Sequence, residues 1–176
     1  MHNYVPLHVH SHFSLLDGLC SPEQLILRAK EIECPSMAIS DHGSIAGWID
    51  FQKAGKKYGI KTIFGCEIYL SKLDQTIKDN TNKKHNHLTL LAKNNNGIKD
   101  LMALVSYTNL PENFYRKPRI SLDNLSLFAK NKNLICLSGC IIGQLSEAIF
   151  EDVGKACLIG EQTENINEVK KLVNII

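Results

Sequence analysis

Short apolar runs alternate along this chain with longer stretches in which apolar residues recur at helical spacing. The short runs are typical of β-strands: "YVPLHVHS" (4–11), "SMAIS" (36–40), "KTIF" (61–64), "NHLTLLA" (86–92) and "NLICLS" (133–138). The longer stretches predict helices over residues 21–34, 44–59, 98–109 and 164–176. The pattern therefore predicts five strands, most of them separated by helices.

Local signals mark the ends of two predicted helices. Ser21 and Gln24 have the spacing of a capping box, and Pro22 stands at the first helical position, where its missing N–H is not needed. Gly59 is expected to end the second helix, because glycine readily adopts the left-handed conformation that stops a helix.

Strands that alternate with helices favour a parallel α/β sheet, in which buried strands read as continuous apolar runs. The segments "SMAIS" and "NLICLS" have this character. In such folds the functional side chains gather at the carboxyl ends of the strands, whether the sheet is closed or open. Polar residues at those ends are therefore the first candidates for chemistry.

Residues with metal-binding side chains fall at most of these positions. His8 and His10 are two apart in the first predicted strand, so their side chains share a face, about 7 Å apart along the chain. The full set comprises His8, His10, Asp17, His42, Glu67, His87 and Cys140. Such nitrogen, oxygen and sulfur donors suit zinc, manganese or iron. The pattern predicts one metal site on a common rim.

Each of these residues also has an ordinary explanation when it is taken alone. Asp17 followed by glycine is a common turn, and a single cysteine such as Cys140 is usually part of a core. Asp41 is interpreted as a helix cap or as a hydrogen-bond acceptor that supports His42. His12 leads into a turn, and we interpret it as an exposed or supporting residue. The joint placement of the set favours the metal site.

Composition limits the location and the partners. The chain has 20 basic and 18 acidic side chains among 176 residues, a balance that neither requires nor excludes a nucleic-acid partner. The amino terminus has no basic stretch followed by a long apolar run, so we expect no signal peptide, no membrane contact and a cytoplasmic protein. Six cysteines without a C-x-x-C pair predict free thiols or metal ligands.

The candidate ligands lie within longer motifs: "LHVHSHFSLLDG", "AISDHGSIAGWIDFQKAGKKYGIKTIFGCEIYL", "HLTLLAKNNNGIKDLMALVS", "FYRKPRIS" and "LSGC". Taken together, these motifs resemble the amino-terminal PHP (polymerase and histidinol phosphatase) domain of bacterial DNA polymerase III alpha subunits. The H-x-H element alone would match the whole superfamily, whereas "FYRKPRI" and the spacing from "DHG" to "GCE" indicate the replicative branch. The resemblance extends from Val5 to Leu145.

This resemblance implies a distorted (β/α)7 barrel with a metal cluster at the carboxyl ends of its strands. It also implies that the candidate set supplies the metal ligands for two or three divalent ions, with zinc or manganese expected and magnesium as a further option. Such a site implies 3′–5′ exonuclease activity, in which metal-bound water attacks and no other catalytic side chain is needed. The DNA polymerase activity of the family resides in residues outside this sequence.

The sequence departs from the family pattern at two places. His12 stands where the family usually has an acidic residue, and no Asp-x-His motif follows "LSGC". We therefore expect residues 1–176 to form a PHP domain truncated before its final metal-binding motif, with a barrel that lacks its last strands.

The resemblance implies three partners, namely DNA, the remainder of a polymerase chain and a separate proofreading exonuclease subunit. Arg116, Lys117 and Arg119 lie beside aromatic residues in "FYRKPR", a combination that suits contact with single-stranded DNA. Two other functions remain open. One is a stand-alone phosphatase for small molecules, similar to histidinol phosphatases, and the other is a non-catalytic module for docking and folding.

Overall fold

The computed structural model describes residues 4–139 and 143–147 as a mixed α/β fold built on one central sheet. The helices are α1 (Pro22–Glu31), α2 (Trp48–Tyr58), α3 (Asn95–Thr108) and α4 (Leu122–Ala129), with a short 3₁₀ helix at Asn80–Asn82. The strands are β1 (Ser36–Ile39), β2 (Lys61–Ser71), β3 (His85–Ala92), β4 (Phe114–Tyr115), β5 (Lys117–Ser121) and β6 (Leu134–Leu137).

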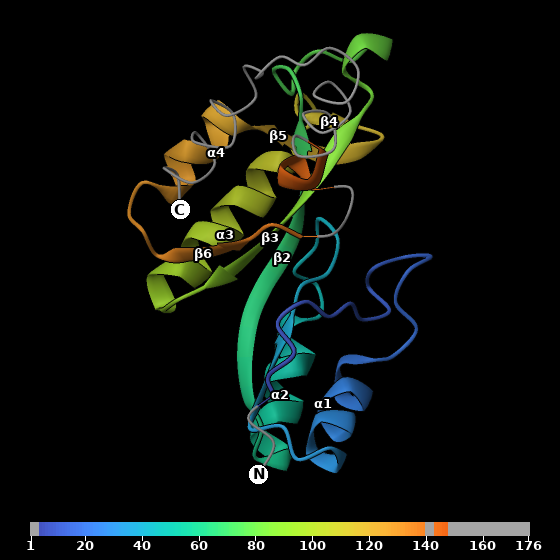
Figure 1. Cartoon of the computed structure of the whole chain (residues 1–176), viewed down its shortest axis with the longest axis vertical. Helices are drawn as coiled ribbons and strands as arrows, with labels where there is room; N and C mark the ends of the chain where they lie inside the picture. The colour runs from blue at the N-terminus through green and yellow to red at the C-terminus, as the bar shows by residue number, and fades with distance from the viewer. Residues whose placement is uncertain (1–3, 140–142, 148–176) are drawn as a thin grey trace, which may run out of the picture.

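Strand β2 is the organising element of the sheet. Its first four residues pair with β1 in parallel, and its second half pairs with β3 in antiparallel and with β5 in parallel. The sheet continues from β3 to β6 and from β5 to β4, in both cases antiparallel. Figure 1 shows β2 as the long strand that links the lower and upper parts of the molecule.

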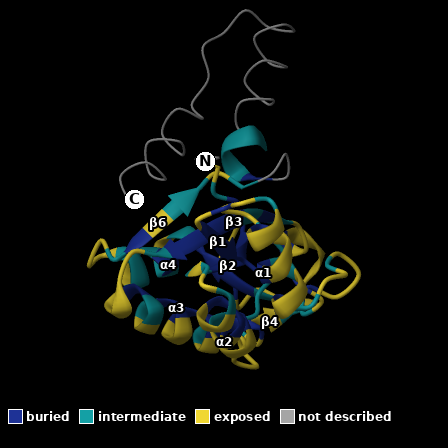
Figure 2. Cartoon of the chain, turned by 90° about the horizontal axis from the view of Figure 1, so that it is seen from below, coloured by how far each residue is buried: buried dark blue, intermediate teal, exposed yellow. Residues whose placement is uncertain are grey.

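The helices cover this sheet in two groups. Helices α1 and α2 lie beside the first half of β2, whereas α3 and α4 lie beside its second half (Figure 1). Figure 2 shows β1, β2 and β3 buried at the centre, with exposed residues on the outer sides of the helices. The core draws on both groups and includes Ile26, Phe51, Ile68, Leu90, Leu101, Leu104 and Leu125. No helix in the described part of the chain is long and apolar enough to span a bilayer.

The helix signals read from the sequence are confirmed. The Ser21 hydroxyl accepts a hydrogen bond from the Gln24 amide, and the Gln24 side chain accepts one from the Ser21 amide. Pro22 begins α1. Gly59 follows α2 with a φ of 76°, which is the left-handed conformation expected of a terminating glycine.

The strand predicted over residues 4–11 is wrong, although this segment runs beside β1. The amides of Ala38 and Ser40 donate to the carbonyls of Pro6 and Val9. The two donors are two residues apart and the two acceptors are three residues apart, so the segments do not keep the register of a sheet. Proline has no N–H to return a bond, and the Val9 amide donates to the Ser40 hydroxyl instead of a backbone carbonyl. A regular ladder therefore cannot form here.

The parallel sheet favoured by the sequence is found only in part: β2 pairs in parallel with β1 and with β5, and the other three strand pairs of the described residues are antiparallel. The segment between β2 and β3 contains a 3₁₀ helix but no α-helix, and the crossover of a parallel pair is usually an α-helix. Strands β2 and β3 are accordingly antiparallel, and the sheet is not closed into a barrel among the described residues. Strand β2 also continues well beyond the predicted end at Phe64. The predicted helix over residues 164–176 lies outside the described residues.

Candidate metal centre

Alternation along β2 and β3 separates the core from the candidate site. Ile68 and Leu70 belong to the hydrophobic core, whereas their neighbours Glu67 and Tyr69 point to the opposite face. Tyr69 is paired with His87 across the β2–β3 ladder, so the two side chains stand side by side on that face. The sheet therefore presents a carboxylate, a phenol and an imidazole on one surface.

Glu67 lies at the centre of this surface and is almost fully buried. The Nε2 atoms of His8 and His10 lie 2.5 Å and 3.0 Å from Glu67 Oε2, and His87 Nδ1 lies 2.8 Å from Glu67 Oε1. Both carboxylate oxygens are thus in contact with imidazole nitrogens. The amino-terminal segment and β3, which are far apart in sequence, meet at this one side chain.

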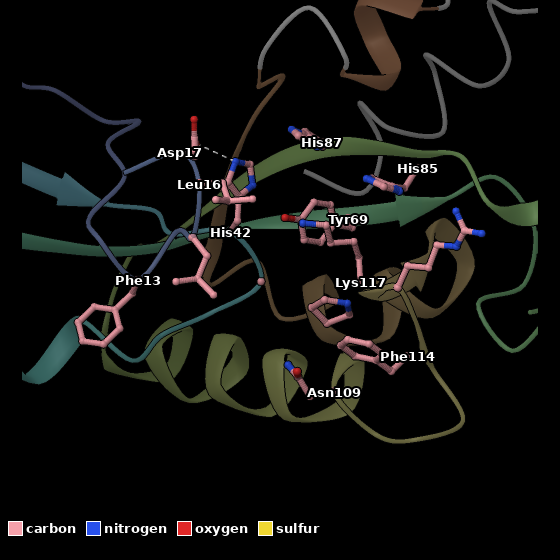
Figure 3. A pocket seen from close by; sticks show the side chains of 14 residues that line it. Phe13, Leu16, Asp17, His42, Tyr69, His85, His87, Asn109, Phe114 and Lys117 are labelled. Atoms are coloured by element: carbon pink, nitrogen blue, oxygen red, sulfur yellow. Dashed lines mark hydrogen bonds and ion pairs between the residues drawn. The ribbon is translucent and has the colours of Figure 1, made fainter. Parts of the chain in front are cut away.

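Asp17 and His42 extend the cluster towards the surface. His42 Nε2 lies 3.1 Å from Asp17 Oδ2, and His10 Nε2 lies 3.7 Å from the same oxygen. Figure 3 shows Asp17 and His42 joined in this way beside Leu16. Three triads have potential ligand atoms within 4.8 Å of one another: His8, His10 and Glu67; His10, Asp17 and His42; and His42, Glu67 and His87. Six of the seven predicted ligands therefore converge, and Cys140 lies outside the described residues.

A buried aspartate positions the loop that carries Asp17. The Asp41 carboxylate accepts hydrogen bonds from the amide and hydroxyl of Ser11, at 2.6 Å and 2.7 Å, and from the hydroxyl of Ser14 at 2.9 Å. The Ser14 hydroxyl also accepts a bond from the His42 amide. Asp41 is therefore a hydrogen-bond acceptor for Ser11 and Ser14 and not a helix cap, because α2 begins only at Trp48.

The same loop needs a glycine at the point where the chain turns back. The amides of Asp17 and Gly18 both donate to the Ser14 carbonyl, which closes a tight turn. A Cβ at Gly18 would lie 1.8 Å from the Ser11 carbonyl oxygen, a distance that no side chain can tolerate. The Asp-Gly pair in the sequence is therefore both a turn and the support for a candidate ligand.

The buried carboxylate of Glu67 governs the electrostatics of the cluster. Burial opposes ionisation of Glu67, but the imidazoles of His10, His8 and His87 outweigh it and hold its pKa far below the usual range. Burial would lower the pKa of His10, but Glu67 outweighs this and raises it. Burial lowers the pKa of His42. Neutral imidazole is the form that binds metal, so His42 is already suited to that role.

One polar atom of the cluster lacks a partner. His42 Nδ1 is buried without a hydrogen bond among the described residues and lies 3.9 Å from Glu67 Oε2. An unsatisfied buried nitrogen is unfavourable unless something else binds it. Imidazole and carboxylate donors at these separations fit a divalent ion, which would fill that role.

Arg119 lies elsewhere than the sequence suggested, and a further histidine, His85, lies close to the cluster. The guanidinium of Arg119 is fully buried and donates to the backbone carbonyls of Gln75, Ile77 and Asn82, so the prediction of Arg119 as a DNA contact is wrong. His85 is half-buried, and its ring lies parallel to that of His87 with centroids 5.8 Å apart. Its spacing of two from His87, like that of the first histidine pair, is the signal that could have found it.

A pocket of about 400 Å³ opens beside the cluster. Asp17, His42 and His87 form part of its wall, and Tyr69 lines it between them (Figure 3). Burial raises the pKa of the Tyr69 phenol to about 12, so its hydroxyl stays protonated at neutral pH. Potential metal ligands and a hydrogen-bond donor therefore face the same space.

Sequence comparisons show to which family the chain belongs. The chain matches the PHP domain family over residues 6–176, and it belongs to that family. A DNA polymerase III subunit alpha from Borreliella burgdorferi is 43% identical over 155 residues, which cover 85% of this chain and 13% of that protein. The subunit from Chlamydia trachomatis is 40% identical over 151 residues, which cover 84% and 12%.

This PHP domain thus matches the amino-terminal region of DNA polymerase III alpha subunits, while spanning about an eighth of the length of those relatives. Among solved structures, a candidate metal-dependent phosphoesterase from Bifidobacterium adolescentis aligns with 59% of this chain and 32% of its own, at 24% identity and a TM-score of 0.44.

Proposed function

We propose that this chain is the PHP domain of a bacterial replicative DNA polymerase III alpha subunit, and that its cluster hydrolyses phosphodiesters as a 3′–5′ exonuclease. The domain would act in the cytoplasm, with the remainder of the polymerase chain, DNA and a separate proofreading subunit as partners. In this proposal the described sheet is one part of a distorted (β/α)7 barrel.

One observation carries the proposal: a buried carboxylate lies against three imidazoles that come from two distant segments of the chain. Glu67 is only 1% exposed, yet its oxygens touch His8, His10 and His87. A buried charge is unfavourable unless it is paired, and an apolar side chain of similar volume would often stabilise the fold equally well. Such an arrangement is typical of a site that binds cations.

The proposed ligands are His8, His10, Asp17, His42, Glu67 and His87, to which Cys140 would add a thiolate. Two or three divalent ions, zinc or manganese with magnesium as a further option, would supply an acidic water and neutralise phosphate charge. Glu67 would hold metal through both of its oxygens, because each oxygen faces different imidazoles. The protonated Tyr69 hydroxyl is available to donate to a phosphate oxygen.

The test uses the full chain, purified and loaded with manganese or zinc. We expect it to contain transition metal and to shorten single-stranded DNA from its 3′ end. His10→Ala should lower metal affinity and hydrolysis by about 100-fold or more, since even supporting residues around metal sites contribute about 10- to 100-fold. His12→Ala is the matched control, because His12 is exposed and outside the three triads; it should retain both properties.

The outcomes separate the rival functions. Hydrolysis of a simple aryl phosphomonoester but not of DNA would replace the proposal with a small-molecule phosphatase. Metal content at background, together with unchanged DNA in the assay, would leave only a docking and folding role. If His10→Ala destabilised the protein without altering hydrolysis, the cluster would be structural.

A further inference from the structure

The pocket beside the cluster has a second wall that the proposed metal chemistry does not use. Leu16, at the tip of the loop that also carries Asp17, forms one side, and Phe114 at the start of β4 forms another. Figure 3 shows Leu16 beside Asp17 and His42, with Phe114 and Asn109 at the other end of the group. The pocket therefore joins a metal-binding end to an apolar and aromatic end.

Leu16 is in an unfavourable position for a leucine. Its side chain is fully exposed and its backbone has a φ of 68°, a conformation that residues with a bulky side chain rarely adopt. The hydrogen bonds of Ser11 and Ser14 to Asp41 hold the beginning of this loop in place. Leu15, its neighbour on the loop, is also exposed and also lines the pocket, and adjoining exposed apolar side chains of this kind are typical of a binding surface.

The opposite wall carries positive charge. Arg116 and Lys117 are exposed at the junction of β4 and β5, and Lys117 Nζ lies 5.2 Å from the centre of the Tyr69 ring. Arg116 has a φ of 63°. Leu16 and Arg116 are therefore two of the four non-glycine residues with positive φ in the described part of the chain, and both line this pocket. Strain of this kind concentrates at functional sites.

We propose that this pocket binds the 3′-terminal nucleotide of a single DNA strand. Its sugar and base would lie between Leu16 and Phe114, its scissile phosphate would face the cluster, and the neighbouring phosphate would face Lys117. The inference rests on the proposed function, because it assigns the substrate's position at that same site.

Three properties of the pocket support this occupant. A volume of about 400 Å³ is within the range of small-molecule sites and is sufficient for one nucleotide. Apolar and aromatic surfaces bind bases through their faces, which all bases share, so binding is independent of sequence. The cations match the charge of the phosphate backbone, which supplies most of the affinity in such complexes.

The first test measures binding without hydrolysis. Fluorescence anisotropy of a labelled oligothymidylate in EDTA reports affinity for the full chain when no metal is bound. We expect Leu16→Ala and Phe114→Ala each to weaken binding by about tenfold. Leu19→Ala is the matched control, because Leu19 is an exposed leucine on the same loop and does not line the pocket. It should bind as the unchanged chain does.

A second measurement addresses the charged wall. Removing one phosphate contact from a single strand lowers the slope of log affinity against log salt by about 0.7. Lys117→Ala should show this change, and Lys56→Ala, which removes an exposed lysine from α2, should not. Circular single-stranded DNA should compete poorly against the labelled oligonucleotide, because it offers no terminus.

The results distinguish this inference from the function on which it rests. If the metal-loaded chain hydrolyses a small aryl phosphodiester while Leu16→Ala and Leu19→Ala bind DNA equally well, the pocket assignment is wrong and the metal chemistry stands. Equal competition by circular DNA would likewise overturn the end-binding site. If the variants weaken DNA binding as expected but no hydrolysis occurs with any metal, the binding site stands and the exonuclease proposal fails.

Discussion

Replacing Asp41 by alanine tests whether the buried serine network positions the candidate ligands. Asp41 is 1% exposed and accepts three hydrogen bonds, from the Ser11 amide and from the hydroxyls of Ser11 and Ser14. Without the carboxylate these donors are buried and unsatisfied, at about 1 kcal/mol each at the lower end of the range. The sum is about 3 kcal/mol. The loop that carries Asp17 can avoid this cost by opening.

Metal binding must then close the loop again, so the cost of closing the loop makes the observed free energy of metal binding less favourable. A cost of about 3 kcal/mol corresponds to a loss of about 100-fold in affinity. Asp41→Asn keeps one acceptor oxygen and the shape of the side chain, so we expect a loss nearer tenfold. Calorimetric titration of the full chain with zinc measures both values.

Asp100→Ala serves as the control for removal of a carboxylate. Asp100 lies on α3 and accepts one hydrogen bond from the side-chain amide of Asn133, away from the three triads. We expect zinc affinity close to that of the unchanged chain. The reasoning would be refuted if Asp41→Ala, shown by circular dichroism to be folded, bound zinc as tightly as Asp100→Ala.

Three further predictions concern the turn, the metal and the thiols. Gly18→Ala should weaken zinc binding at least tenfold, as measured by titration, because its Cβ displaces the loop. Gly59→Ala, with open space around its Cβ, should lower only the thermal stability, as measured by melting curves. Zinc at about 100 times its dissociation constant should raise the melting temperature by about 5–10 °C, and Glu67→Gln should abolish the shift in differential scanning fluorimetry. Burial raises the pKa of Cys136 to about 12, so only about one part in ten thousand is thiolate near pH 8. Iodoacetamide should therefore modify the exposed Cys20 long before Cys136, and mass spectrometry measures this order.

The helix ends could be predicted because they depend on contacts within a few residues. The capping box at Ser21 and Gln24 and the glycine at Gly59 require no knowledge of the remainder of the fold. The convergence of the candidate ligands could also be anticipated from the placement of unusual side chains next to apolar runs. His42 and Glu67 lie in an isolated bridge between two segments, as their positions after successive strands suggested.

Long-range geometry could not be predicted in the same way. The direction of β3 depends on the path of the chain between residues 72 and 84, and no local pattern specifies it. Arg119 looks like a surface cation in the sequence, and only the carbonyls of a distant loop explain its burial. The role of Ser40 in interrupting the first ladder likewise arises from the tertiary contact with Val9.

Strand β2 keeps stability and chemistry on opposite faces. Cys66, Ile68 and Leu70 pack into the core, while Glu67 and Tyr69 face the cluster and the pocket. Substitutions on the second face therefore open no cavity in the core. The imidazoles of His8 and His87 also lie against the two oxygens of the buried carboxylate, so groups of the protein itself satisfy both oxygens. A fold arranged in this way should form before the metal binds.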